Sequence, residues 1–381
     1  MFSRFRKKPE NENLAGGNPN ALIELRRLVK KFRNAAGEVT VLKGIDAAFQ
    51  AGEFASIVGR SGSGKSTLLN MITGIDHPSS GYVRVGDAVL HTMDEGQLSV
   101  WRGKNMGIVF QFFQLLPMLT LLENVMLPMD FCNTYPPAKR ESRAKDLLTM
   151  VGLAGLEHKY PAAVSGGQQQ SAAVARALAN APPILVADEP TGNLDSRTAE
   201  RVLEIFEEQA AKGKTIFMVT HDSSLAQRAK RVLVISDGEL IPEGISRAFP
   251  ALTHDLMLQI THMAQVRHFD PGEVVMRGED RLALLLVTGG AMTAIVSGQM
   301  GTHVAADVLR AGSLFSRVDQ QSFKRILVGL RAESEAEALV WETLPESTDL
   351  ADTLNMLAQK RAAAYLEASN HHGEVSLLNG C

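Results

Sequence analysis

The sequence predicts an α/β fold organised around a phosphate-binding loop, followed by a smaller α+β part. Residues 59–67 read Gly-Arg-Ser-Gly-Ser-Gly-Lys-Ser-Thr, which is a complete loop of this kind. The run Phe54–Val58 before it is typical of a short buried strand, and apolar residues follow it at helical spacing from Leu68 to Ile72. After Gly244 the sequence changes to a series of short strand-like runs. We therefore expect two domains.

The residue types of the loop suit a nucleoside triphosphate. Glycines permit the backbone turns that aim N–H groups at phosphates, and the positive end of the following helix faces the same anion. Lys65 would place its charge between the β- and γ-phosphates, and Ser66 would bind Mg²⁺. The alternative is a Gly/Ser-rich turn without a ligand. The candidate nucleotide-binding residues here are Gly59, Ser61, Gly62, Ser63, Gly64, Lys65, Ser66 and Thr67.

Composition limits the classes of function. The chain has 381 residues, of which 45% are hydrophobic, enough for two cores. A net charge of −3 gives no general electrostatic basis for nucleic-acid binding. Cys132 and Cys381 lack metal-ligand spacing, which fits a reducing cytoplasm. Residues 1–20 are basic and then polar, so we expect a mobile tail rather than a signal peptide. No segment reads as a membrane span, so a membrane role would come from a partner.

Polar residues follow three further predicted strands, at the strand ends where α/β folds bind ligands. Gln111 is the first of them. Asp188 is suited to Mg²⁺, and Glu189 to orienting or deprotonating an attacking water. His221 would offer an imidazole beside the γ-phosphate. The strands concerned are Gly107–Phe110, Ile184–Ala187 and Thr215–Val219.

Three other features have two interpretations each. Ser165-Gly166-Gly167-Gln168 opens a predicted helix and offers either a second anion site or an ordinary helix start. Phe32 ends a predicted strand, where its ring would stack on adenine or pack in the core. The apolar run from Phe112 to Leu116 is either core or an exposed groove for a partner helix.

Together these residues resemble the ATP-binding subunit of an ATP-binding cassette (ABC) transporter over residues 21–245. Six elements occur in that family's order: the adenine-stacking aromatic Phe32, the phosphate loop, Gln111, the signature Ser165–Gln168, Asp188-Glu189 and the switch residue His221. The stretches around Gln111, the signature and Thr191–Asp195 resemble the branch of lipoprotein-release, macrolide-export and cell-division ATPases.

The resemblance implies a P-loop NTPase fold with antiparallel β and α-helical subdomains. It implies a homodimer with two ATP molecules, each held by one chain's phosphate loop and the other chain's signature. Gln111 would sense the γ-phosphate or Mg²⁺, and the Phe112–Leu116 run would pass closure to a separate permease. Asp195 joins the nucleotide-binding candidates. The implied location is cytoplasmic, on the inner face of the cell membrane.

Two positions depart from the family's pattern. Ser171 stands where Arg or Lys is usual, and Val164 replaces the leading Leu of the signature. Val164 is a conservative apolar change. We expect position 171 to be exposed near the dimer interface, where losing a charge would alter the turnover rate and cost about 1 kcal/mol or less.

The second part resembles a cyclic-nucleotide-binding domain over residues 249–370, with a flexible tail at 371–381. We expect a helix over Phe249–Met263, a β-roll of short strands and a closing helix over Leu350–Leu366. Arg317 stands where that family has a ribose-binding Glu, and it cannot accept those hydrogen bonds. We therefore expect a degenerate fold for docking or dimerisation that binds no cyclic nucleotide. The alternative is another anion bound by Arg317 and Arg325.

The leading hypothesis is an ATPase subunit whose ATP-driven dimer closure powers a membrane permease, with a regulatory or scaffold domain at the C-terminal end. A second hypothesis is a non-transport ABC ATPase that acts as a mechanical switch on an envelope or cell-division membrane protein. A third, an ABC ATPase on DNA or ribosomes, is disfavoured because the chain lacks a second cassette, a coiled coil and a basic surface.

Overall fold

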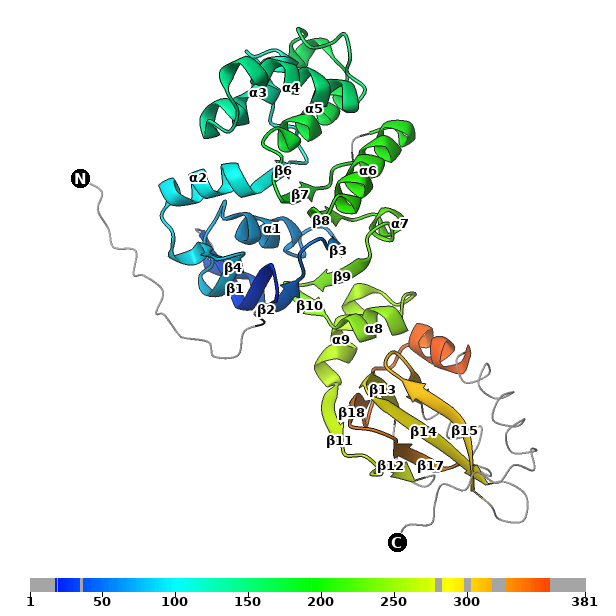
Figure 1. The fold of residues 1–381 in the computed structure, drawn as a ribbon. Helices are drawn as coiled ribbons and strands as arrows, with labels where there is room; N and C mark the ends of the chain where they lie inside the picture. Colours follow the sequence, from blue (N-terminus) through cyan, green and yellow to red (C-terminus); the bar gives the residue numbers. More distant parts are fainter. Residues whose placement is uncertain are drawn as a thin grey trace. The chain divides into compact units, whose positions relative to one another are not determined.

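The computed structural model describes residues 18, 20–34, 37–192, 194–277, 283–297, 303–316 and 327–356. It divides into two compact units, Met1–Leu240 and Ile241–Cys381 (Figure 1). Several predicted features lie outside the described residues. They are most of the tail at 1–20, all of the tail at 371–381, Asn193, the end of the closing helix, and Arg317 with Arg325.

A six-stranded sheet in the order β10-β9-β3-β8-β7-β6 forms the centre of the first unit. The pairs β6–β7, β7–β8, β8–β3 and β3–β9 are parallel, so their carboxyl ends meet at one edge. The predicted strands in this sheet are confirmed to within a residue or two at their ends. The bounds are β3 Phe54–Val58, β6 Met106–Val109, β7 Ile184–Asp188, β8 Thr215–Thr220, β9 Arg231–Ser236 and β10 Glu239–Ile241.

An antiparallel sheet in the order β2-β1-β4-β5 packs against this centre. β1 and β2 form an antiparallel hairpin whose pairing runs from Ile23–Phe49 to Asn34–Gly37 at the turn. Alternating apolar residues of both strands, such as Ile23, Leu25 and Ile45, are buried in a core shared with β3 and α1. The bounds are β1 Ile23–Asn34, β2 Gly37–Phe49, β4 Ser80–Val85 and β5 Ala88–Val89.

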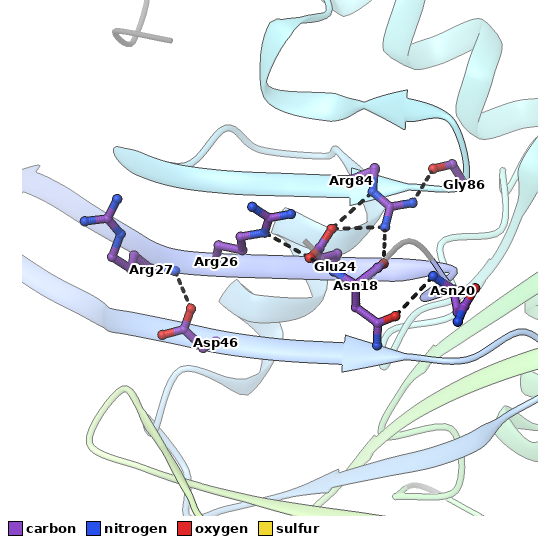
Figure 2. A network of polar contacts seen from close by, with 8 residues as sticks. All are labelled: Asn18, Asn20, Glu24, Arg26, Arg27, Asp46, Arg84 and Gly86. Atoms are coloured by element: carbon purple, nitrogen blue, oxygen red, sulfur yellow. Dashed lines mark hydrogen bonds and ion pairs between the residues drawn. The ribbon is translucent and has the colours of Figure 1, made fainter. Parts of the chain in front are cut away.

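A buried carboxylate links strands of this sheet to the chain that precedes them (Figure 2). Glu24 accepts hydrogen bonds from Arg26 Nε at 2.9 Å, Arg84 Nη2 at 3.0 Å and the Asn18 backbone N–H at 2.8 Å. Burial raises the pKa of Glu24, but these hydrogen bonds outweigh it and lower the pKa to about 2. The folded protein therefore stabilises the ionised form of the Glu24 carboxylate.

Helices α3, α4 and α5 pack on one another and on β6 and β7, and they form the helical group drawn in green in Figure 1. The helix predicted to begin at the signature is confirmed as α5. The bounds are α1 Lys65–Thr73, α2 Glu95–Asn105, α3 Leu121–Cys132, α4 Pro137–Met150, α5 Gly166–Leu178, α6 Ser196–Ala211 and α7 Ser223–Ala226.

The second unit contains two four-stranded sheets, β11-β18-β13-β16 and β12-β17-β14-β15, with their own buried core. Neighbouring strands in both sheets are paired antiparallel. Trp341 is fully buried, and its indole N–H donates to the Ile260 carbonyl at 2.6 Å, which ties a helix to a strand. The bounds are β11 Gln265–Phe269, β12 Val274–Arg277, β13 Leu284–Gly289, β14 Ala291–Ser297, β15 His303–Arg310, β16 Leu314–Ser316, β17 Leu327–Ala332 and β18 Ala336–Trp341.

One prediction for this unit is wrong in detail. The helix expected over Phe249–Met263 begins later, as α9 His254–Met263, because Pro250 interrupts and the Thr253 side chain caps the helix. A separate short helix, α8 Glu243–Ala248, ends before the predicted range. A turn at Gly272, whose φ of 85° favours glycine, separates β11 from β12.

Candidate nucleotide-binding site

The phosphate-binding loop joins β3 to α1 and needs glycine at several positions. Gly62 and Gly64 have φ of 81° and 103°, in the region that favours glycine. A Cβ at Gly59 would lie 2.4 Å from the Ile235 carbonyl oxygen, so a side chain there would collide with β9. The loop therefore follows the central sheet closely and turns directly into the first turn of α1.

Lys65 is the first residue of α1, and its side chain folds back across the loop. Its Nζ donates to the Gly59 carbonyl at 2.8 Å and to the Arg60 carbonyl at 2.9 Å. Burial lowers the pKa of Lys65, while Glu189 and Asp188 raise it. Its ammonium group is thus held at the anion-binding face of the loop.

Asp188 ends β7 beside the loop and fits a Mg²⁺ ion. Its Oδ1 is buried and has no hydrogen-bond partner among the described residues, and the Ser66 hydroxyl bonds the carboxylate. Burial raises the pKa of Asp188 and nearby Glu189 raises it further, against the Ser66 bond and Lys65. A cation at Oδ1 would favour the ionised form. The described residues contain no group of three or more His, Cys, Asp or Glu that could hold a metal.

Glu189 is held from two sides by residues of neighbouring strand ends. Its Oε2 accepts a hydrogen bond from Gln111 Nε2 at 3.1 Å, and its Oε1 lies 3.1 Å from His221 Nδ1. The backbone of Glu189 has φ 45°, an unfavourable conformation for a residue with a side chain. Gln111 and His221 therefore both contact the carboxylate of Glu189, the third residue that the sequence predicts to be catalytic.

A cavity of about 540 Å³ opens over the loop and this carboxylate. Val41 of β2 also lines the cavity. The sequence analysis did not predict this residue; its position on the strand that follows Phe32 could have suggested it. Asp188 lies beneath, next to Ser66. The predicted residues that line the cavity are Ser61, Gly62, Gly64, Lys65, Ser66, Thr67, Gln111, Glu189 and His221.

Phe32 does not line this cavity and is 43% exposed on β1. The core interpretation of Phe32 is therefore wrong, because its ring stays accessible. The Lys30 ammonium lies 4.9 Å from the ring centroid while it pairs with Asp76 at 2.6 Å, so one ring face is covered by a fixed cation.

The signature residues and Asp195 also lie outside the cavity. Ser165 caps α5, where its hydroxyl accepts from the Gln168 N–H at 3.2 Å, and Ser165 and Gly166 are exposed. Asp195 caps α6 and accepts from the Thr198 hydroxyl at 2.7 Å. Within one chain these residues do not line the cavity of the phosphate-binding loop.

Ser171 is not on the surface, contrary to expectation. It is 6% exposed on the buried side of α5, next to Ala172. A small side chain fits this packing, so the replacement of Arg or Lys is a change in helix packing rather than the loss of an exposed charge.

The apolar run after Gln111 is divided between core and surface. Leu115 packs on the core formed with the helical group, whereas Phe112 is 73% exposed. Met118, just beyond the run, is 71% exposed. A groove of about 930 Å³ adjoins the run between α2, β6, α3 and α5, and its lining includes Val100, Phe110, Gln114, Leu127 and Phe131. Exposed apolar side chains beside a groove favour the partner interpretation.

Comparison with known proteins agrees with this geometry. The family model described as ABC transporter matches residues 42–192. The ABC transporter ATP-binding protein YvrO of Bacillus subtilis is 44% identical over 220 residues, which are 58% of this chain and 96% of that protein. The chain belongs to the ABC transporter ATP-binding proteins.

Two further relatives of this ABC protein extend the comparison. The macrolide export ATP-binding/permease protein MacB of Burkholderia lata is 38% identical over 252 residues, covering 66% of this chain and 36% of MacB. The chain thus spans about a third of the length of the MacB relatives it matches. The ATP-binding cassette MJ0796, solved as a dimer after hydrolysis with ADP and Pi, aligns with a TM-score of 0.55 and 39% identity over 57% of this chain and 96% of that one.

The ABC fold of the first unit is therefore established, and the matches of YvrO and MJ0796 cover little more than half of this chain. Within the described ranges, no helix has both the length and the apolar character needed to cross a membrane.

Proposed function

We propose that this protein is the ATP-binding and ATP-hydrolysing subunit of an ABC-type membrane transporter. The observation that supports this proposal most strongly is that Gln111 and His221 both contact the Glu189 carboxylate. The phosphate-binding loop lines the same cavity. Glu189 is the general base for water, and Gln111 and His221 position that base and the γ-phosphate. The transporter names of the relatives support the coupling to transport.

The backbone N–H groups of the phosphate-binding loop and the Lys65 ammonium group bind the phosphates. The other phosphate-binding residues are Gly59, Ser61, Gly62, Ser63, Gly64, Ser66 and Thr67. Ser66, Asp188 and Gln111 would hold Mg²⁺, which when bound would supply positive charge to the phosphate oxygens. The attacking water gives its proton to Glu189, and Lys65 stabilises the phosphoryl oxygens by its fixed charge. His221, on the exposed side of the cavity, contacts the γ-phosphate once ATP is bound.

The functional form in this proposal is a homodimer. Ser165, Gly166, Gly167 and Gln168 cap the exposed end of α5, and Asp195 caps α6, away from the chain's own cavity. They complete the partner's site, while Phe32 stacks on adenine in their own chain's site. That MJ0796 was solved as a dimer supports this arrangement.

The groove beside Phe112 and Met118 receives a helix of a separate permease subunit. Its apolar lining and the exposed ring of Phe131 suit an amphipathic helix end. The protein would then act on the cytoplasmic face of the membrane without crossing it. Of the branches named above, the macrolide-export-like branch agrees with the MacB relatives.

The second unit is, in this proposal, a degenerate cyclic-nucleotide-binding-like domain over residues 249–370 with a regulatory or scaffold role. Its two four-stranded antiparallel sheets between helices are compatible with a β-roll. The ligand-binding candidates Arg317 and Arg325 lie outside the described residues. Arg317 in place of a ribose-binding Glu is what disfavours a cyclic nucleotide.

Glu189→Gln tests the proposal because it removes the base while keeping size and hydrogen-bonding capacity. We expect the hydrolysis rate with MgATP to fall about 10²- to 10⁴-fold and an ATP-bound dimer to accumulate in size-exclusion chromatography. Glu200→Gln, on the exposed face of α6, is the matched control and keeps wild-type turnover. Monomeric elution of Glu189→Gln with saturating ATP would contradict the dimer mechanism.

A further inference from the structure

The buried side chain of Gln170 joins the signature helix to the loop that carries Glu189. Gln170 lies in α5, five residues after Ser165, and is 2% exposed. Its Nε2 donates a hydrogen bond to the Pro190 carbonyl at 2.9 Å. Pro190 is buried and directly follows Glu189.

The chemistry of this bond fixes the orientation of the amide. The Pro190 carbonyl is an acceptor, and proline has no N–H to offer in exchange. The Nε2 group of Gln170 must therefore face the carbonyl. Its Oε1 is then buried without a hydrogen-bond partner among the described residues.

Packing stability alone does not explain a glutamine at this place. An unpartnered buried acceptor lowers the free energy of unfolding, and an unbranched apolar side chain of the same length would avoid that cost. The benefit of the glutamine is thus its single directed bond to the Pro190 carbonyl.

That bond acts on a strained part of the chain. Glu189 has φ 45°, and its backbone N–H donates to the Val219 carbonyl at 2.8 Å on β8. The Gly192 N–H closes the turn by donating to the Glu189 carbonyl at 3.2 Å. The Gln170 bond holds the same turn from the side of α5, so a shift of α5 moves the backbone next to the Glu189 carboxylate.

A second contact connects the start of α5 with the same segment of chain. A Cβ added at Gly167 would meet Thr198 Cγ2 at 3.5 Å and Leu194 Cδ2 at 3.7 Å, so the first turn of α5 lies against the beginning of α6. In a helix, Ser165 and Gln170 are separated by only about 7.5 Å along the axis. Movement at the capped end of α5 therefore reaches Pro190 through rigid, hydrogen-bonded structure.

We propose that Gln170 is a positioning residue that couples the two ATP sites of the dimer. The inference rests on the proposed function, in which a chain's signature binds the partner's ATP while its Glu189 acts on its own. Closure on the partner's ATP moves α5, and the Gln170–Pro190 bond passes this movement to Glu189. One chain's hydrolysis thereby depends on the occupancy of both sites.

Gln170→Met tests this coupling in the full-length protein, because methionine keeps the length of the side chain and removes the donor. We expect kcat for MgATP to fall about tenfold, KM to change less than twofold, and the Hill coefficient to fall towards 1. ATP binding is retained because the phosphate-binding loop is untouched. In the Glu189→Gln background, Gln170→Met should still form the ATP-bound dimer.

Gln209→Met is the matched control. Gln209 is a buried glutamine of α6, 5% exposed, away from the turn at Glu189. Melting temperatures of both variants separate folding from coupling, and Gln170→Leu provides a second variant if the methionine protein folds poorly. If both positions lose activity only in proportion to folded protein and keep the wild-type Hill coefficient, the coupling role of Gln170 is refuted while the proposed function stands. A wild-type protein that neither hydrolyses MgATP nor dimerises with it would overturn both.

Discussion

Glu24 shows at the scale of one residue how a charge can be essential to an antiparallel sheet. The carboxylate receives hydrogen bonds from two arginines and a backbone N–H, and its pKa falls to about 2 although burial acts in the opposite direction (Figure 2). The nearby pair of Lys31 and Glu38 has the same charges but is exposed on both sides. Exposed pairs of this kind contribute little to stability.

Glu24→Gln should therefore lower the free energy of unfolding by about 1.5–3 kcal/mol at pH 7. The folded-state pKa of Glu24 is below its ordinary value of 4.5, so the carboxylate's contribution is complete above pH 4.5. It is lost as the pH falls towards 2. Chemical denaturation at several pH values measures the difference, which should shrink on acidification.

Glu38→Gln is the control and should change stability much less than Glu24→Gln at each of these pH values, because the Lys31–Glu38 pair is exposed. Equal losses for the two variants, or a Glu24→Gln effect independent of pH, would show that the buried network does not stabilise the sheet.

At the scale of an element, one fully buried residue of α3 holds the loop after Gln111 in place through hydrogen bonds. Asn124 Oδ1 accepts from the Leu116 N–H at 2.7 Å, and its Nδ2 donates to the carbonyls of Leu116, Leu119 and Thr120. Thr120 itself caps α3 in a capping box with Glu123. The exposed apolar residues that adjoin the groove are thus displayed by a loop anchored to a helix.

Asn124→Ala should destabilise the protein by about 3 kcal/mol, because several buried backbone groups lose their partner. ATP binding should persist, while co-purification with a permease subunit is lost as the loop detaches. Asn105→Ala, which removes one bond to the Trp101 carbonyl, should have a small effect on both. A stable Asn124→Ala protein with a normal partner complex would contradict the anchoring role.

Local sequence patterns predicted some elements well and others not at all. The strands beneath the site were predictable because short apolar runs end at polar residues, as at Val58 and Asp188. No pattern of apolar spacing predicted α3, since Pro128 interrupts it; the capping box at Thr120 was the available signal. The burial of Ser171 depends on how α5 packs on its neighbours, which spacing within α5 did not reveal.

Some residues of the candidate site could likewise be predicted from the sequence, and others could not. Residue types at strand ends predicted that Gln111, Glu189 and His221 approach each other, because carboxyl ends of parallel strands share an edge. The Gln170–Pro190 bond could not be predicted, since it depends on side-chain direction between two elements. Val41 was missed because the register of the hairpin decides which of its residues face the loop.

At the scale of the whole molecule, each unit has a core of its own. The cores of the first unit use residues from Ile23 to Ile235, and that of the second unit uses residues from Phe269 to Val340. YvrO, nearly all of which matches 58% of this chain, shows that a protein of the first unit's extent occurs by itself. The first unit should thus fold without the second.

Deletion of residues 249–381 should leave MgATP binding intact and alter either the hydrolysis rate or the assembly with the permease by at least about twofold, if the second unit is regulatory or a scaffold. Steady-state hydrolysis and co-purification measure the two effects. Unchanged values for both would remove the regulatory and scaffold proposals. Failure of the shortened chain to bind ATP would contradict the independence of its core.

The left-handed backbone of Glu189 has a consequence for how such a sequence evolves. A glycine would adopt φ 45° without strain, whereas a residue with a side chain loses about 1–2 kcal/mol there. Replacing Glu189 with glycine should therefore stabilise the fold. Under the proposed function the same substitution would remove the general base, so stability and hydrolysis make opposite demands on this position.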